Sequence, residues 1–429
     1  MRCCVVGLGY IGLPTAALFA ARGHHVVGVD ADPRRLDLRR DGDPAEPGLK
    51  ELIDDGLRSG RLSVAAEVVE ADAFLVCVGT PRVPGRPEVA LAEVLGAVDA
   101  VAPRLRAGNL VVVESTVPPG TTDDVVRPRL EAGSGLACGR DFHLAFCPER
   151  VLPGNLVHEL VHNCRVVGGV DAAGGQRAAA LFRSVVAGDV AVTDARTAEF
   201  VKLMENTWSA VNIALANEFA VLAERAGVDV HEAITLAGRH PRVRLMRPGP
   251  GVGGHCIPVD PGFLVDWAPD AAPLIRQALA TNDAMPRHVA DAVLAALAQV
   301  GKAAGDARVV LAGVTYKGGV DDVRGSPALA LAGHLAAAGA SVVFQDPVAT
   351  RFPHPVVPGL SDAVEGADAL VIVADHPHYA GLALELPALA ARMRPSPVLV
   401  DTRGMVPAAD GFLLWRLGRG FVPPAGDAH

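Results

Sequence analysis

Cys256 lies in a segment so rich in glycine and proline that neither a helix nor a regular strand is expected there. The segment covers residues 248–261 and reads Pro-Gly-Pro-Gly-Val-Gly-Gly-His-Cys-Ile-Pro-Val-Asp-Pro. A thiol presented on such a loop is a candidate nucleophile, and Asp260 follows it by four positions. The residues alone favour this interpretation no more than its alternative, a structural loop whose cysteine is a small buried hydrophobe.

Lys202 and Asn206 are four residues apart in Thr197–Ala226, a stretch without glycine or proline that predicts one long helix. That spacing puts both side chains on the same face of the helix. Lys202 stands in the apolar run Phe200–Met204. It could be an ordinary solvated helix residue, but an unpaired ammonium group in such a run would be costly.

A glycine pattern near the N-terminus predicts a dinucleotide site. The sequence Gly-Leu-Gly-Tyr-Ile-Gly follows a strand pattern and opens a helix pattern, the context in which such glycines allow a tight turn and a close approach to a diphosphate. The alternative is a turn in a glycine-rich chain. The pattern assigns cofactor contacts to Gly7, Gly9, Tyr10, Ile11 and Gly12.

Asp30 ends the next apolar run, eighteen positions after Gly12. A carboxylate there accepts a hydrogen bond from a ribose 2′-OH and repels a 2′-phosphate, so NAD is favoured over NADP. We expect Asp30 to meet this ribose and no other group. The neighbouring cations Arg34 and Arg35 weaken the preference, and Arg35 is a further candidate contact of the cofactor.

Two further apolar runs end in small polar residues, Cys77–Pro81 and Glu114–Pro118. Ligands of open parallel sheets lie beyond the carboxyl ends of the strands, so Thr80, Pro81 and Thr116 are expected to face the cofactor. Either loop alone would also suit an ordinary capping turn.

The elements that position these residues alternate between short apolar runs and helical patterns, first from residue 3 and again from residue 308. This alternation is typical of βαβ units. The predicted fold class is α/β, with two Rossmann-like doubly wound parallel-sheet domains joined by a helical waist that contains one long central helix. The predicted domains are 1–192, which carries the dinucleotide pattern, 193–304, the helical waist with the Cys256 loop, and 305–429, the second Rossmann-like domain.

Within the waist, a second helix is expected over Ala271–Val300, interrupted by Pro273 and Pro286. In the last third the pattern predicts a strand, a helix and three more strands. These are Val309–Gly313, Pro327–Ala338, Ser341–Gln345, Ala369–Ala374 and Val398–Asp401.

Composition excludes several classes of function. The 429 residues are half hydrophobic and carry a formal charge of −9, which disfavours nucleic acid and anionic membranes as partners. No apolar run reaches the roughly 18 residues that span a bilayer, and the N-terminus does not read as a signal peptide. We expect a soluble, cytoplasmic protein.

Neither disulfides nor a metal site is expected. The seven cysteines form no CxxC pair, and most should be small buried hydrophobes. His354, His376 and His378 stand in proline-rich loops, where histidines usually face solvent.

The chain resembles the nucleotide-sugar 6-dehydrogenases, the family typified by UDP-glucose dehydrogenase. The stretch Gly-Gly-His-Cys-Ile-Pro-Val-Asp-Pro, residues 253–261, matches the family's nucleophile motif, and the resemblance covers nearly the whole chain. Four further segments look most like the UDP-N-acetylmannosamine dehydrogenase branch, namely 146–154, 193–199, 202–207 and 239–243.

The resemblance implies a four-electron oxidation of a sugar C6 alcohol to an acid with NAD, through a thiohemiacetal and a thioester on Cys256. It implies catalytic roles for Cys256, Lys202, Asp260, Asn206, Glu149 and Thr116, and it gives His255 a structural role. Substrate contacts are implied for Glu149, Arg150, Val151, Lys202, Asn206, Arg242, Gly253 and Lys317. Arg324 matches a cofactor contact, and Arg242 matches a residue that reaches the substrate of the partner subunit.

Three departures from the family bear on the sugar. Pro153 stands where some relatives have a second glutamate, Gly325 replaces a glutamate, and Gly262 replaces an aromatic residue. UDP-N-acetylglucosamine and UDP-glucose are therefore kept as alternatives to UDP-N-acetylmannosamine. A two-electron β-hydroxyacid dehydrogenase would share the first domain and a lysine on the long helix but would not need Cys256, and a silent nucleotide-sugar binder would need none of the reactive residues.

A homodimer is expected from the long helix, because Thr197–Ala226 carries more apolar residues than one core-facing stripe requires. A second copy of the chain would cover the remaining face. The alternative is burial of both faces within one chain.

Overall fold

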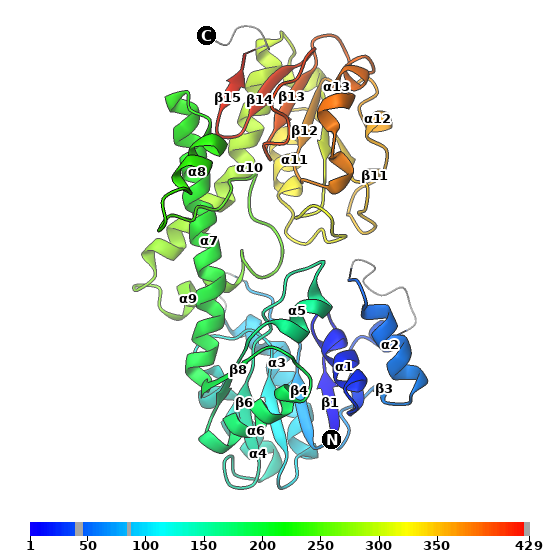
Figure 1. The fold of residues 1–429 in the computed structure, drawn as a ribbon, viewed down its shortest axis with the longest axis vertical. Helices are drawn as coiled ribbons and strands as arrows, with labels where there is room; N and C mark the ends of the chain where they lie inside the picture. Colours follow the sequence, from blue (N-terminus) through cyan, green and yellow to red (C-terminus); the bar gives the residue numbers. More distant parts are fainter. Residues whose placement is uncertain (39–45, 84–86, 424–429) are drawn as a thin grey trace. The chain divides into compact units, whose positions relative to one another are not determined.

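The computed structural model describes residues 1–38, 46–83 and 87–423, and the chain forms two compact units. The first comprises Met1–Glu205 and Gly262–Ala271, and the second Asn206–Pro261 and Ala272–His429 (Figure 1). No helix among the described residues is long and apolar enough to cross a membrane. The three-domain division predicted from the sequence remains a prediction.

The first unit is built on an eight-stranded sheet in the order β3-β2-β1-β4-β5-β6-β7-β8. All neighbouring strands are parallel except β6 and β7. The strands are β1 (Arg2–Val6), β2 (His25–Val29), β3 (Leu62–Ala65), β4 (Ala73–Val76), β5 (Leu110–Val113), β6 (His143–Phe146), β7 (Arg165–Gly169) and β8 (Val190–Asp194).

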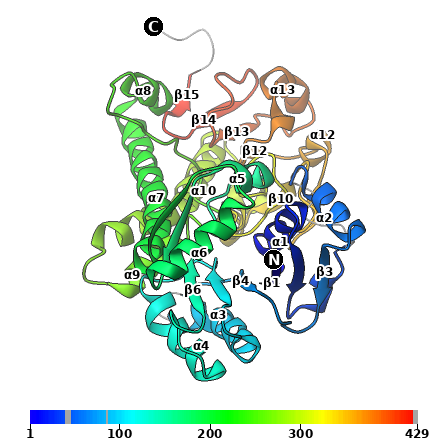
Figure 2. The same ribbon diagram turned by 60° about the horizontal axis from the view of Figure 1, so that its bottom comes forward.

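Successive residues of a strand point to opposite faces of the sheet, and helices cover both faces. Cys3 and Val5 pack with α1 (Gly12–Ala21), α2 (Leu49–Arg58) and α6 (Ala172–Arg183), and α1 lies against α2 in Figure 2. Cys4 and Val6 pack on the other face with α3 (Pro87–Val101) and α4 (Arg127–Ser134). A short helix, α5 (Leu156–His162), follows β6.

The long helix is α7 (Ala195–Ala226), which is continuous in both views (Figure 1, Figure 2). It begins two residues before the predicted start because Asp194 caps it, with Oδ1 accepting from the Thr197 backbone N at 2.8 Å. The other helices of the middle third are α8 (Val230–Ala237), α9 (Asp260–Trp267) and α10 (Pro273–Gln299).

The predicted interruptions of α10 are wrong. Pro273 is its first residue, where a missing N–H costs nothing. Pro286 lies inside the helix, which continues because Met285, Val289 and Val293 pack into the core of the second unit. That packing outweighs the hydrogen bond that a proline removes.

The second unit has a seven-stranded sheet in the order β11-β10-β9-β12-β13-β14-β15. Only β14 and β15 are antiparallel neighbours. The strands are β9 (Arg308–Ala312), β10 (Ser341–Gln345), β11 (Val356–Val357), β12 (Ala369–Ile372), β13 (Val398–Asp401), β14 (Leu413–Arg416) and β15 (Gly420–Val422). The sequence patterns missed β11, β14 and β15, which are short.

Helices cover both faces of the second sheet as well. Val309 and Leu311 pack with α10 and α11 (Pro327–Ala337), whereas Val310 and Ala312 pack with α13 (Leu382–Ala390). The remaining short elements are α12 (Leu360–Ala363), η1 (Pro33–Leu36), η2 (Ala102–Arg104), η3 (Thr121–Val126), η4 (Ala304–Asp306) and η5 (Pro377–Tyr379). The first six strands of each sheet share one order, so the predicted pair of Rossmann-like domains is confirmed.

Candidate active site

The glycine loop after β1 has the geometry that its spacing predicts. Gly7 has a φ of 96°, and a Cβ there would lie 2.7 Å from the Cys77 carbonyl oxygen. A Cβ on Gly12 would lie 1.8 Å from the carbonyl oxygen of Gly7, so only glycine lets α1 start this close to the loop. The N-terminus of α1 follows directly, and its N–H groups favour an anion.

Asp30 is buried at the end of β2 and is engaged by the protein itself. Its Oδ2 accepts from the Leu8 backbone N at 2.7 Å, its Oδ1 accepts from Asp32 N at 2.8 Å, and the Arg35 guanidinium lies 3.3 Å from Oδ2. The expectation that Asp30 meets only a ribose is therefore wrong, because the same carboxylate holds the glycine loop in place.

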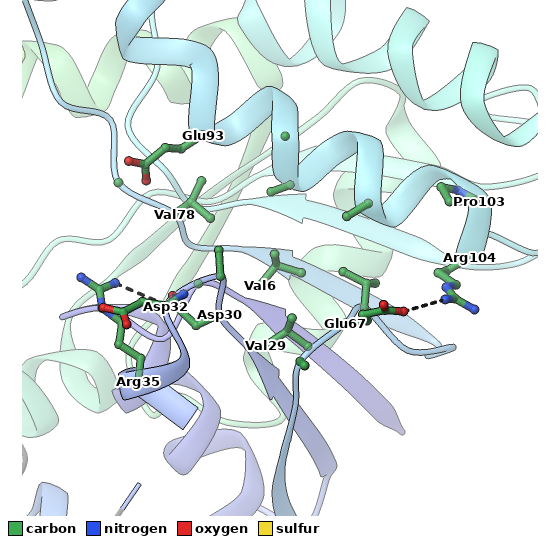
Figure 3. A pocket seen from close by; sticks show the side chains of 18 residues that line it. Val6, Val29, Asp30, Asp32, Arg35, Glu67, Val78, Glu93, Pro103 and Arg104 are labelled. Atoms are coloured by element: carbon green, nitrogen blue, oxygen red, sulfur yellow. Dashed lines mark hydrogen bonds and ion pairs between the residues drawn. The ribbon is translucent and has the colours of Figure 1, made fainter. Parts of the chain in front are cut away.

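A pocket of about 850 Å³ opens beside this loop. Figure 3 shows Asp30, Asp32 and Arg35 at one end, the ion pair of Glu67 and Arg104 at the other, and valines between them. Of the cofactor residues predicted from the sequence, Gly7, Asp30 and Arg35 line it. The other lining residues are Val6, Val29, Ala31, Asp32, Ala66, Glu67, Val68, Val78, Gly79, Glu93, Gly96, Ala97, Ala100, Pro103 and Arg104.

Seven further cofactor candidates of the first unit are not among the residues that line the pocket. Gly9, Tyr10, Ile11 and Gly12 follow β1, Thr80 and Pro81 follow β4, and Thr116 follows β5. The last two loops are tied together by Ser115 Oγ, which donates to the Val78 carbonyl oxygen at 2.7 Å. This is the arrangement expected at the carboxyl ends of parallel strands.

Glu199 is a residue that sequence reasoning missed. It is buried on α7 and its carboxylate accepts from the backbone N of Gly120 at 2.5 Å and of Thr122 at 2.7 Å. It therefore fixes the end of the Thr116 loop against α7. The signal in the sequence was its place at the end of segment 193–199, which resembles the family, although the resemblance implied no role for it.

Lys202 and Glu149 form a buried ion pair within the first unit. The Lys202 Nζ lies 2.7 Å from Glu149 Oε1 and also donates to the Glu149 carbonyl oxygen at 2.9 Å. The other carboxylate oxygen of Glu149 accepts from the Val151 backbone N at 3.1 Å. The pair thus links α7 to the loop after β6, and the expectation that Lys202 is more than a solvated helix residue fits its burial.

Arg150, a predicted substrate contact, is engaged by its own unit. Its Nε donates to Glu205 at 3.0 Å, and its Nη1 donates to the Cys164 carbonyl oxygen at 2.6 Å. Burial lowers the pKa of this guanidinium, but Glu205 outweighs it and leaves the pKa of Arg150 raised. Arg150 is therefore held at the foot of the same loop as Glu149.

Glu46 and Arg82 are two further residues that the sequence did not single out. Glu46 is buried, accepts from the Tyr10 hydroxyl, and accepts from Gly154 N at 2.8 Å. Arg82 makes a two-pronged ion pair with Asp266 of α9, at 2.8 and 3.0 Å. Its guanidinium occupies the space beside Gly262, where a Cβ would lie 2.3 Å from it, which explains why an aromatic residue does not stand there.

Cys256 lies half-buried in the second unit. Its carbonyl oxygen accepts from the backbone N of Val259 at 3.0 Å and of Asp260 at 2.8 Å, so the chain turns tightly after the thiol. Asp260 is buried and accepts from Asn206 Nδ2 at 2.5 Å. The segment was expected to be non-helical throughout; Asp260 and Pro261 instead begin α9.

The nucleophile loop packs on the loop after β9. A Cβ on Gly253 would lie 2.5 Å from Tyr316 Cβ, and Gly254 N donates to the Arg324 carbonyl oxygen at 2.9 Å. Lys317, half-buried, lies on the same loop after β9. The structure therefore brings together Gly253, Cys256 and the Lys317 loop within one unit.

Two predicted residues have exposed side chains. Arg242 is exposed after α8, and Arg324 is exposed with its guanidinium paired to Asp322 at 2.6 Å. Burial raises the pKa of Asp322, but Arg324 outweighs it and leaves this pKa lowered.

The expectation for the histidines is wrong at one position. His354 and His378 are exposed, but His376 is fully buried. It is buried because Asp346 and Thr315 supply hydrogen-bond partners for its ring, at 3.0 and 2.9 Å. All seven cysteines lie within the described residues and outside any disulfide, and four of them are buried as expected.

The candidate residues thus fall into two groups. Thr116, Glu149 and Lys202 belong to the first unit, and Asn206, Asp260 and Cys256 belong to the second. Lys202 and Asn206 are four residues apart on the continuous helix α7, so their side chains leave the same face of that helix.

Three family models match successive parts of the chain. They describe the UDP-glucose/GDP-mannose dehydrogenase family, with its NAD-binding domain matching residues 1–186, its central domain 196–284 and its UDP-binding domain 310–408. A UDP-N-acetyl-D-mannosamine dehydrogenase of Methanocaldococcus jannaschii is 42% identical over 98% of this chain and 97% of its own. The chain belongs to the UDP-glucose/GDP-mannose dehydrogenase family.

Solved structures of the family agree with this membership. A UDP-D-ManNAc dehydrogenase from Pyrococcus horikoshii matches with a TM-score of 0.92 and 41% identity, covering 98% of this chain and 100% of that one. A UDP-N-acetyl-mannosamine dehydrogenase from Staphylococcus aureus matches with a TM-score of 0.86 and 38% identity, covering 97% and 98%.

The chain is therefore an NAD-dependent UDP-sugar dehydrogenase. The glycine loop, the α1 N-terminus and the pocket beside Asp30 fit the dinucleotide that this family binds. The second sheet, with Lys317 after β9, is the UDP-binding domain of the dehydrogenase.

Proposed function

We propose that this dehydrogenase oxidises the C6 alcohol of UDP-N-acetylmannosamine to the uronate, as a step toward a surface polysaccharide precursor. The observation that carries the proposal is similarity over nearly the full chain to dehydrogenases named for this sugar.

The reaction removes four electrons from each sugar, and bound NAD supplies the chemistry by accepting one hydride in each of two rounds. Between them, the Cys256 thiolate adds to the aldehyde carbon, forming a C–S bond and a thiohemiacetal. Loss of the second hydride leaves a thioester on Cys256. Water then breaks the C–S bond, releasing the acid and returning the thiol. A half-buried thiol that forms no disulfide supports this role.

Lys202 stabilises the oxyanion that develops at C6, because a buried ammonium in a water-poor site interacts strongly with developing negative charge. Glu149 holds that ammonium and accepts a proton from the attacking water. Asn206 and Asp260, joined by a hydrogen bond of 2.5 Å, orient the same water from the nucleophile's unit. Thr116 assists proton transfer from the loop after β5.

The proposed substrate contacts come from three loops. Glu149, Arg150 and Val151 come from the loop after β6, and Gly253 and Lys317 from the loops of the second unit. Lys317 is the cation for the diphosphate of the nucleotide sugar. Arg242, exposed after α8, reaches the substrate of a partner subunit, and Arg324 contacts the cofactor.

We further propose a homodimer formed through α7. Six large apolar side chains of this helix are at least 39% exposed: Phe200, Met204, Trp208, Leu215, Phe219 and Leu222. At about 100° per residue, they fall within an arc of roughly 100°, a single stripe about 33 Å long. A second copy of α7 covers such a stripe with the same residues on both sides.

The cytoplasm is the proposed location. Seven cysteines outside any disulfide, one of them the exposed Cys164, suit a reducing compartment.

NADH production from a panel of nucleotide sugars tests the reaction. UDP-N-acetylmannosamine, UDP-N-acetylglucosamine, UDP-glucose and GDP-mannose are each mixed in limiting amount with excess NAD. We expect the highest kcat/KM with the first sugar, and two NADH and one acid per sugar. Release of one NADH with free aldehyde contradicts the thioester route. A higher kcat/KM for another sugar contradicts UDP-N-acetylmannosamine as the substrate and assigns that other sugar instead.

A further inference from the structure

A buried polar cluster lies at the carboxyl ends of β9, β10 and β12, outside the reactive groups described above. It consists of Thr315, Asp346, His376, Tyr379 and Gln345, each at most 5% exposed. The Tyr379 hydroxyl donates to Gln345 Oε1 at 2.6 Å, and the Tyr379 ring meets the His376 ring edge-on at 5.6 Å. Nothing in the family's oxidation chemistry as set out above uses His376.

Asp346 in this cluster repeats the arrangement of Asp30 in the first unit. Each ends the second strand of its sheet and accepts from the loop that follows the first strand: Leu8 N at 2.7 Å on Asp30, and Val314 N at 2.7 Å on Asp346. Asp346 differs in its other partners, because Thr315 N, Val348 N and Ala349 N also donate to it. With His376 on Oδ2 at 3.0 Å, no place is left for a ribose hydroxyl.

The hydrogen bonds of His376 determine its tautomer. Gly319 N can only donate, and it does so to Nδ1 at 3.1 Å, so Nδ1 carries no hydrogen. The ring hydrogen therefore lies on Nε2, which faces Asp346 Oδ2 at 3.0 Å and Thr315 Oγ1 at 2.9 Å. The adjacent residue Asp375 pairs with Arg403 at 2.9 Å.

These contacts hold the loop that carries Lys317. Thr315 Oγ1 donates to the Lys317 carbonyl oxygen at 3.0 Å. Two residues after Lys317, the backbone N of Gly319 donates to Nδ1 of His376. Between them, a Cβ on Gly318 would lie 2.2 Å from the Asp375 carbonyl oxygen, so the loop packs directly on the segment that carries His376. The backbone on both sides of Lys317 is therefore tied to one buried imidazole.

We propose that His376 is a positioning residue for the nucleotide part of the substrate. Held by Asp346, it fixes the loop 315–319 and thereby places Lys317 where a diphosphate lies beyond the carboxyl ends of the strands. The inference rests on the proposed role of Lys317 and deepens the proposed function. Ordering the loop before binding lowers the entropy that UDP-sugar binding must overcome.

Three substitutions separate the two halves of this arrangement. His376→Asn keeps an acceptor near Nδ1 for Gly319 N but loses the hydrogen bonds to Asp346 and Thr315. His376→Gln keeps a donor near Nε2 for Asp346 but loses the hydrogen bond from Gly319 N. His376→Ala loses both. UDP and NAD affinities of the full chain are measured by calorimetry, and each variant's Tm is recorded.

We expect His376→Ala to raise the UDP Kd roughly tenfold or more, Asn and Gln to give smaller rises, and the NAD Kd to stay within about twofold. The proposal also requires that the effect of His376 on UDP binding depends on Lys317. In a Lys317→Ala background, His376→Gln should therefore change the UDP Kd little, because the group that it positions is gone.

His288→Gln is the matched control, since His288 also pairs with a carboxylate, Glu224 at 2.9 Å, in the same unit. It should leave the UDP Kd unchanged. Wild-type UDP affinity in the folded Gln and Asn variants overturns the proposal, as does an equal loss of NAD affinity, or full additivity with Lys317→Ala. Because UDP alone is the probe, a wild-type enzyme that binds UDP but oxidises another sugar contradicts only the proposed substrate.

Discussion

The ammonium of Lys202 lies 2.7 Å from Oε1 of Glu149, and the two side chains are only 5% and 9% exposed. Removing one member of a buried ion pair leaves the other charge buried without compensation. Removing both charges together lowers the free energy of unfolding far less. The effect of the pair on stability can therefore be measured separately from its effect on catalysis.

Lys202→Met should lower the free energy of unfolding by about 3–5 kcal/mol and reduce kcat by orders of magnitude. The double variant Lys202→Met/Glu149→Gln should regain most of the stability but none of the activity. Urea unfolding and NADH production measure the two effects. Recovery of activity in the double variant would remove Lys202 from the reaction.

Cys256→Ser should abolish steady-state acid formation while sugar and NAD still bind, because a hydroxyl is a far weaker nucleophile than a thiolate near neutral pH. Intact-mass spectrometry of the wild type with UDP-sugar and NAD should show an adduct that maps to position 256. Cys138→Ser, at another half-buried cysteine, is the control and should retain full activity. Near-wild-type acid formation by Cys256→Ser would make a route centred on Lys202, of the β-hydroxyacid dehydrogenase type, the better reading.

Asp30→Ala should raise the KM for NAD roughly tenfold or more, the cost of a hydrogen bond to a charged group. Because Asp30 also accepts from Leu8 N and Asp32 N, the same change should lower Tm, which a role limited to the ribose does not predict. Asp55→Ala, at an exposed carboxylate paired with Arg58, is the control. An unchanged KM for NAD would place the ribose elsewhere.

Burial raises the pKa of Glu114 from 4.5 to about 7, although Arg165 opposes the shift. Between these values the folded protein keeps a proton that the unfolded chain has lost, so stability falls as pH rises from about 4.5 to about 7 and then levels off. Glu114→Gln removes this dependence. Its stability relative to the wild type should grow over that range by at most about 3 kcal/mol. Urea midpoints from pH 5 to 8 measure it, and a constant difference contradicts the shifted pKa.

Trp208→Glu should convert a dimer to a monomer at micromolar concentration, because it places a charge in the apolar stripe of α7. Light scattering coupled to gel filtration measures the mass. Leu384→Glu, at an 88% exposed leucine of α13, should leave the mass unchanged. A monomeric wild type at the same concentration contradicts the dimer itself.

The sequence by itself determined the parts of this protein that depend on neighbouring residues. The turn at Gly7, the long helix over Thr197–Ala226, and the non-helical approach to Cys256 follow from backbone preferences and apolar periodicity over a few positions. The α/β class followed from the alternation of such segments. Motif resemblance then supplied the roles of residues that local pattern leaves open.

The tertiary structure decided what depends on residues far apart in the chain. Asp30 holds Leu8 across 22 positions, and His376 is buried because Asp346 and Thr315, 30 and 61 positions away, pair with its ring. Pro286 stays helical because the core of the second unit packs around it. In each case a long-range partner outweighs a local preference, because buried hydrogen bonds and packing contribute more free energy than the preference of one residue for a loop or a solvent-facing position.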